Sequence, residues 1–268
     1  MNRASWILLA ILLLAAAAFF AFRAMQPGPP PVPVTAPAEP SPTPPEEPAP
    51  APAFLPGTLP PADVEPAGEP LPALDDSDPE VRDAAVDLLG EEYVEQLLTP
   101  VDIVRRAVVT VDNLPREKIA LRLRVVPPLP GRFITSGDDD QWTVISADNF
   151  ARYTPWVKTF AAADTEQILG VYSRLYPLFQ QAYQELGYPD AQFNDRVIAV
   201  IDDLLAAPEI DGPIRLVRPH VLYQFADPEL EARSAGQKTL IRMGRENAAL
   251  VKAKLREIRS SISADRPR

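Results

Sequence analysis

The chain has 268 residues, a formal net charge of −11 and no cysteine. Without cysteine the protein forms no disulfide, no thiolate nucleophile and no Cys-ligated metal site, and its acidic balance argues against nucleic acid as a partner. The single histidine, His220, is too few for a histidine-based zinc site. We therefore expect neither a metal nor a cofactor.

The first 24 residues are predicted to be a transmembrane anchor. Ala4–Phe22 contains 19 residues without a charge, and a helix of that length spans about 28 Å, close to the thickness of a bilayer core. Arg3 and Arg23 flank the run, and the slight excess of positive charge before it favours an N-terminus in the cytoplasm. The predicted location is a single pass through the bacterial inner membrane, with the lipid bilayer as partner and the C-terminal domain in the periplasm.

A cleaved signal peptide is the alternative interpretation of this segment. Its apolar stretch would be Trp6–Leu14, with cleavage in the Ala15–Ala18 run. Against this, the apolar run continues to Phe22, and the sequence Phe22-Arg23-Ala24 makes a poor small-x-small cleavage site. The pattern favours the uncleaved anchor.

Residues 25–72 are predicted to be a disordered proline-rich linker. Of the 33 prolines in the chain, 19 lie between Pro27 and Pro72. Proline favours polyproline II and excludes helix, and the acidic side chains repel one another, so the segment is extended. About 47 residues at about 3.1 Å each give an upper limit of roughly 145 Å. Such a segment suits a spacer that carries a domain away from the membrane.

The rest of the chain, residues 73–263, is predicted to be a globular, mainly helical domain, followed by a short tail at 264–268. Cap residues, prolines in first turns, terminal glycines and apolar residues at three- and four-residue spacing indicate the helices. Thr99 and Pro100, for example, predict a helix start at 99. The expected helices are 77–90, a short helix over 91–98, 99–113, one from 115, 147–161, 164–187, 194 to about 207, 227–243 and 246–262.

One stretch between the helices has β-strand character. Arg132–Thr135 and Gln141–Ile145 are rich in β-forming residues and are joined by the turn sequence SGDDD, which predicts a small hairpin. The later stretch GPIRLVRPHVLYQF also looks extended. The expected fold class is therefore mainly α, a helical domain with a minor β-hairpin, preceded by one transmembrane helix and the linker.

The chain resembles a known family through several long strings that follow one another in order. These are LLTPVDIVRRAVVTVDNLPRE, NFARYTPWV, VYSRLYPLFQQAYQELGYP, FNDRVIAVIDDLLAAPEIDGPI, YQFADPELEARSAGQKTLIRMG and NAALVKAKLREI. On these strings the segment from about Leu71 to Ile262 is similar to the family catalogued as domain of unknown function 3014. The resemblance implies a membrane-anchored envelope protein of proteobacteria with a proline-rich spacer, and it implies no activity and no catalytic residue.

Several chemically suggestive residues have a simpler structural interpretation. His220 lies in an apolar extended stretch and has no Ser/His/Asp setting. The Asp138–Asp140 turn lacks the ligand spacing of an EF-hand. Paired carboxylates such as Asp202–Asp203 could hydrolyse a glycan, but they are common on helix surfaces. The aromatic residues of the helix at 164–187 could form a sugar platform, although their spacing is typical of a core.

The candidate binding site is a set of polar residues with several arginines, because the guanidinium fork suits carboxylates and phosphates. The alternative is that these side chains satisfy helix ends and acidic neighbours within the fold. The set comprises Arg105, Arg106, Asn149, Arg152, Tyr153, Arg174, Asn194 and Arg196.

The expected function is that of a non-enzymatic binding or scaffold domain for another cell-envelope component. The expected partner is an envelope protein or peptidoglycan. The alternative is a carboxylate-dependent enzyme that acts on cell-wall glycan or peptide. We favour binding because the sequence has no cysteine nucleophile, no Gly-framed serine and no metal-ligand spacing.

Overall fold

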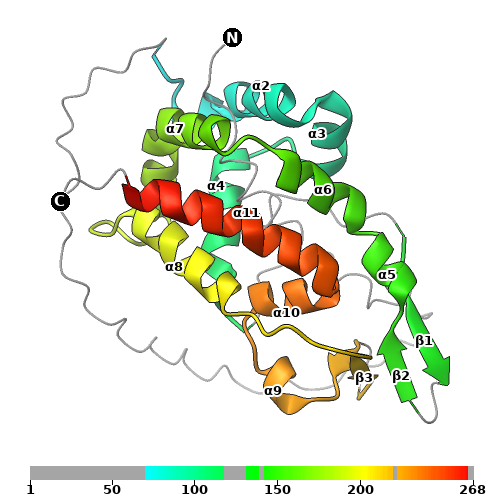
Figure 1. The fold of residues 1–268 in the computed structure, drawn as a ribbon. Helices are drawn as coiled ribbons and strands as arrows, with labels where there is room; N and C mark the ends of the chain where they lie inside the picture. Colours follow the sequence, from blue (N-terminus) through cyan, green and yellow to red (C-terminus); the bar gives the residue numbers. More distant parts are fainter. Residues whose placement is uncertain (1–69, 118–130, 139–141, 220–221, 265–268) are drawn as a thin grey trace, which may run out of the picture.

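The computed structural model describes residues 70–117, 131–138, 142–219 and 222–264. Within these ranges the chain is mainly helical with a small antiparallel sheet at one end, which confirms the predicted fold class at this level (Figure 1). The elements are the 3₁₀ helix η1 (Leu74–Asp76), the helices α2 (Asp78–Leu89), α3 (Glu91–Leu97), α4 (Ile103–Asn113), α5 (Ala147–Ala151), α6 (Thr154–Ala162), α7 (Thr165–Glu185), α8 (Phe193–Leu205), α9 (Pro228–Glu231), α10 (Ala235–Arg242) and α11 (Arg245–Ala264), and the strands β1 (Thr135–Asp138), β2 (Trp142–Ile145), β3 (Arg215–Val217) and β4 (Gln224–Phe225).

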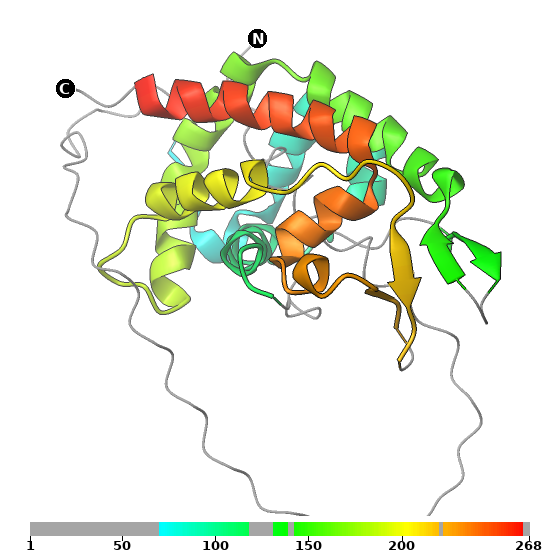
Figure 2. The ribbon, with the colours of Figure 1, turned by 60° about the horizontal axis from the view of Figure 1, so that its bottom comes forward.

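Most of the helices pack into one body, which we call the helical body (η1, α2–α4, α6–α8 and α11). Helix α11 lies across one side of it and contacts α6, α7 and α8, while α4 packs against α2, α7 and α8 (Figures 1 and 2). Apolar side chains from these helices form the larger hydrophobic core of the described residues. Its fully buried members include Ile103, Phe160, Ile168, Leu175, Phe179, Phe193 and Leu204.

The long helix α7 follows directly from its sequence signals. Asp164 is its N-cap, and the Asp164 carboxylate accepts hydrogen bonds from the main-chain N–H groups of Glu166 and Gln167. Pro177 lies inside the helix. Gly187 follows the helix with a φ of 118°, a left-handed conformation that glycine adopts without a Cβ penalty.

The strands form a second region, which we call the sheet region (β1–β4, with α5, α9 and α10). The order is β1-β2-β3-β4 and every pair is antiparallel. The predicted hairpin is thus half of a four-stranded sheet, and its first strand lies at Thr135–Asp138 instead of Arg132–Thr135. Phe133 is buried in the small core of this region, and the N–H of Ile134 donates to Asn149, so these residues are engaged before the strand begins.

The start of α4 corrects the sequence-based prediction of a helix capped by Thr99. The helix begins at Ile103, after Asp102 in a left-handed conformation with a φ of 54°. The carboxylate of Asp78, on α2, accepts the main-chain N–H groups of Asp102 and Ile103 at 2.8 Å each. A side chain 24 residues earlier therefore caps the helix, and the local Thr99-Pro100 signal is overridden.

The predicted single helix over 227–243 is two helices. Asp227 caps α9 and Ser234 caps α10, each with a side-chain acceptor. The first N–H groups of α10, from Ala235 and Gly236, donate to main-chain carbonyls just after α4 at 2.7 and 2.9 Å. A Cβ on Gly236 would lie 2.6 Å from a terminal methyl group of Leu204 and 3.3 Å from the carbonyl oxygen of Leu114, so any larger residue would force the Leu204 side chain to shift.

Part of the sequence-based prediction lies outside the described residues. This applies to the predicted anchor at 4–22, to residues 25–69 of the predicted linker, to most of the helix predicted from 115, and to His220, Asp139 and Asp140. Among the residues that the structure describes, no helix combines the length and the apolar character needed to cross a membrane.

Candidate functional site

The structure divides the eight predicted binding residues among three places and does not gather them in one groove. Arg105, Arg106 and Arg174 lie around α4 and α7. Asn194 and Arg196 lie at the start of α8. Asn149, Arg152 and Tyr153 lie in and just after α5, where the sheet region meets α6.

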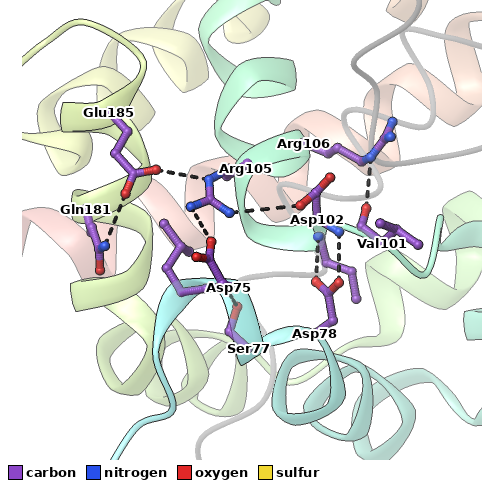
Figure 3. A network of polar contacts seen from close by, with 11 residues as sticks. Asp75, Ser77, Asp78, Val101, Asp102, Arg105, Arg106, Gln181 and Glu185 are labelled. Carbon is purple, nitrogen blue, oxygen red and sulfur yellow. Dashed lines mark hydrogen bonds and ion pairs between the residues drawn. The ribbon is translucent and has the colours of Figure 1, made fainter.

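Arg105 connects three elements of the helical body. Its Nη2 lies 2.7 Å from the carboxylate of Asp75 on η1, and its Nε donates to Glu185 on α7 at 3.0 Å (Figure 3). The hydrogen bonds to Asp75 and Glu185 raise the pKa of Arg105. The guanidinium therefore already has two close acidic partners within its own chain.

The other two arginines of this group also have partners inside the fold. Arg106 Nε donates to the main-chain carbonyl of Val101 at 2.9 Å, as Figure 3 shows. Arg174, on α7, forms an ion pair with Glu80 on α2. The Arg174 contact joins two helices of the helical body, and the Arg106 contact joins α4 to the turn before it, so both arginines satisfy acceptors within the fold.

Arg196 belongs to a buried cluster that the sequence did not reveal, because Asp112 follows an apolar stripe and gives no local sign of burial. The Asp112 side chain is only 4% exposed. It lies 3.0 Å from Arg196 Nε and 2.6 Å from Arg116 Nη2, and Tyr188 donates to it at 3.4 Å. Asn194 lies apart and accepts a hydrogen bond from Tyr172.

The aromatic residues of α7 behave mainly as core residues. Tyr172, Phe179 and Tyr183 are buried, and the Phe179 ring stacks on Phe193 with centroids 5.7 Å apart. Tyr176 is half-buried, and its hydroxyl contacts Gln180 and Gln192. The stripe therefore supplies packing between α7 and α8 rather than a row of exposed rings.

The third group remains together, and we call it, with Arg242, the Asn149 cluster (Asn149, Arg152, Tyr153 and Arg242). Asn149 is fully buried at 0% exposure. Its Nδ2 donates to the main-chain carbonyl of Arg242 at 3.2 Å, and its Oδ1 accepts from Arg152 Nη1 at 3.0 Å. Arg152 Nη2 also donates to the carbonyl of Gly131 at 3.3 Å. The buried amide thus joins α5 to the end of α10.

Arg242 is the member that sequence reasoning missed, although it interrupts the apolar run LIRMG. It is 7% exposed, and its guanidinium carbon lies 4.7 Å from the centroid of the Phe225 ring. Burial lowers the pKa of Arg242, and the charge of Glu231 opposes that shift. A cation–π contact contributes about 0.5–2 kcal/mol, whereas burying an unpaired charge costs several kcal/mol. The contact with Phe225 therefore offsets only part of the cost of burying Arg242.

Tyr153 links the two arginines of the cluster electrostatically. Its side chain is 2% exposed, and burial raises its pKa to about 12. The positive charges of Arg152 and Arg242 both oppose this rise of the Tyr153 pKa. Burial also lowers the pKa of Arg152.

The joint between α10 and α11 holds this cluster in place. Gly244 has a φ of 85°, and a Cβ there would lie 2.7 Å from the Phe150 ring. Asn247 Nδ2, on α11, donates to the main-chain carbonyl of Phe150 at 2.9 Å. Because glycine permits the close approach, α5 packs directly on the joint and Asn149 reaches Arg242.

Comparison with known proteins gives one match. The model of the family described as "Protein of unknown function (DUF3014)" matches residues 103–259, which is more than half of the chain. The matched range includes all eight predicted residues and Arg242. No curated protein and no solved structure matches the chain.

Proposed function

Because the chain belongs to the DUF3014 family, whose description states no activity, we propose its function from its own architecture. The protein is a non-enzymatic binding domain of the bacterial cell envelope. Residues 4–22 hold it in the inner membrane, and the proline-rich linker carries the domain into the periplasm, where it binds another envelope component. The confirmed family resemblance is consistent with this arrangement.

One observation carries the proposal. The first described element, η1, begins at Leu74, two residues after the last proline of the linker, and Leu74 is already buried in the larger core. The first described element thus follows directly after the predicted spacer, which itself follows an apolar run of membrane-spanning length. This order suits a domain that meets its partner at a distance from the bilayer.

The competing function, a carboxylate-dependent hydrolase, finds little support in the described residues. Such enzymes need two carboxyl groups that face one substrate. Asp112, the buried carboxylate of the described residues, is neutralised by Arg116 and Arg196. Asp203, whose pKa burial raises, accepts hydrogen bonds from Ser234 and Gln237.

The proposal is tested on the full-length chain in a Gram-negative host. A reporter that is active only in the periplasm, fused after Arg268, should function, and the chain should remain with membranes in high salt, because salt weakens electrostatic but not hydrophobic attachment. A photo-crosslinker at the exposed Asp148 should capture one envelope component, whereas the same group at the exposed Glu92 serves as the control. Release of a soluble product that begins near Ala18 would contradict the anchor.

A further inference from the structure

The buried cations of the described residues provide an internal comparison. Four basic side chains are buried: Lys238, Arg242, Lys252 and Lys254. All three lysines donate Nζ to a main-chain carbonyl at 2.9 Å or less, and the accepting residues are, in the same order, Glu231, Ala207 and Ala163. Charge burial in this fold is thus normally accompanied by a strong acceptor.

Arg242 departs from this pattern. Among the described residues its guanidinium has no hydrogen-bond acceptor and no ion pair, and its buried Nε has no partner. Its contact is the face of the Phe225 ring. The nearby carboxylate of Glu231 is already engaged by the N–H of Phe225 at 2.9 Å and by Lys238 at 3.4 Å. The guanidinium fork therefore lacks the acceptor that it is built to bind.

The surroundings of Arg242 are positively charged in an otherwise acidic protein. The Asn149 cluster contains two arginines, Arg152 and Arg242, and no carboxylate, whereas the whole chain carries a net charge of −11. This is a local environment that favours an added negative group.

The cluster also extends to the molecular surface. Arg152 is half-buried and donates to the carbonyl of Gly131, which is exposed, and Ile134, whose N–H donates to Asn149, is exposed as well. Asn149 holds Arg152 on one side and the main chain of Arg242 on the other. One side of the site is thus within reach of solvent, while the other is fixed by buried hydrogen bonds.

We propose that Arg242 and Arg152 bind one oxyanion, a carboxylate or phosphate group on the partner of this domain, with Asn149 fixing their relative position. Planar guanidinium groups bind such oxyanions with paired, charge-assisted hydrogen bonds. The location of the ligand in the envelope depends on the proposed function above, whereas its chemistry depends only on the Asn149 cluster.

The test uses the full-length chain in detergent micelles, titrated with inorganic phosphate or acetate at constant ionic strength against chloride. Thermal unfolding is followed by circular dichroism. At ten times the Kd, one bound anion should raise the Tm by about 3–5 °C. The shift should saturate, unlike the general stabilisation that salts such as phosphate exert through surface exclusion. The anion that binds identifies the source as a phosphate or a carboxylate.

Variants locate the site. Arg242→Gln should abolish the saturable shift in Tm, and Arg152→Gln should raise the Kd for the anion at least tenfold. Arg245→Gln is the control and should leave this Kd unchanged, since Arg245 pairs with Asp211 on the surface. If Arg242→Gln fails to fold, the anion titrations of the wild type and of Arg152→Gln still test whether the anion binds at this site. No saturable shift in the wild type, or a shift that survives both Arg152→Gln and Arg242→Gln, overturns the proposal. This titration does not depend on where the protein lies in the cell, so a negative result from the periplasmic reporter would leave it unaffected.

Discussion

The helical body and the sheet region differ in how they accommodate buried charge. In the helical body, arginines face carboxylates on neighbouring helices, as in the pairs Arg174–Glu80 and Arg196–Asp112. In the sheet region, Arg152 contacts an amide and a main-chain carbonyl, and Arg242 contacts an aromatic ring. Both regions contain arginines, but those of the helical body pair with carboxylates across helices, whereas Arg242 in the sheet region has an aromatic ring in place of a carboxylate.

This difference separates structural arginines from candidate binding arginines. A paired guanidinium has already exchanged water for a protein acceptor, so a ligand would have to displace that acceptor. A guanidinium that is buried without an acceptor gains one when an anion binds. The region with the smaller core therefore carries the stronger binding candidate.

The largest expected effect tests whether the helical body holds most of the stability. Phe179→Ala should lower the free energy of unfolding by about 3–5 kcal/mol, because the ring is fully buried and stacks on Phe193. Tyr176→Ala, at a half-buried position on the same helix, should cost about 1–3 kcal/mol. Urea unfolding measures both, and equal losses would show that burial does not rank these positions.

A smaller effect tests the value of a paired charge in the helical body. Asp112→Asn should cost about 3 kcal/mol in unfolding free energy, since Arg116 and Arg196 lose the carboxylate between them. Asp202→Asn is the matched control, because Asp202 is 53% exposed and pairs with Arg259 on the surface. Its loss should stay below about 1 kcal/mol. If Asp112→Asn left the free energy of unfolding unchanged, the pairing of charges would not stabilise the helical body, and the proposed difference between the two regions would be wrong.

The smallest effect concerns Lys254, a buried cation that has an acidic partner in addition to its carbonyl. Its hydrogen bond to Glu257 is the main cause that lowers the pKa of Glu257 from its ordinary value of 4.5. The resulting stabilisation is present above pH 4.5 and is lost as the pH falls through the lower folded pKa. Because Glu257 is 55% exposed, solvent screening limits it to about 0.5 kcal/mol.

The matching measurement compares Glu257→Gln with the wild type in urea unfolding at several pH values. The wild type should be slightly more stable at pH 7, and the difference should shrink below pH 4.5. A difference that stays constant from pH 7 to pH 3 would show that the Lys254–Glu257 contact contributes nothing through charge.

The sequence predicted those parts of the fold that depend on neighbouring residues. Asp164 and Gly187 placed both ends of α7, because a cap and a terminal glycine act within one helical turn. The start of α4 could not be found in this way, since its cap is the distant Asp78. The strand pairing of Leu216 with Thr143 and Phe225 is likewise a long-range contact.

The same distinction applies to the candidate site. Asn149, Arg152 and Tyr153 were predicted together and lie together because they share one short segment of chain. Arg105 and Arg196 were added by residue type, and their partners Glu185 and Asp112 lie about 80 residues away in the sequence. Arg242 was missed because only folding brings it against α5.

The contacts of η1 have a mechanical consequence. A pulling force that arrives through the residues before η1 is applied to the fold at Leu71, which packs against the larger core, and then at Leu74 and Asp75. Asp75 binds Arg105 on α4, and Arg105 binds Glu185 on α7, so the force is shared between two long helices (Figure 3). Leu74 adds an apolar contact with the core. Under tension, the apolar contacts of Leu71 and Leu74 with the larger core are therefore expected to resist the peeling of η1, and the exposed Asp75–Arg105 pair adds little to them.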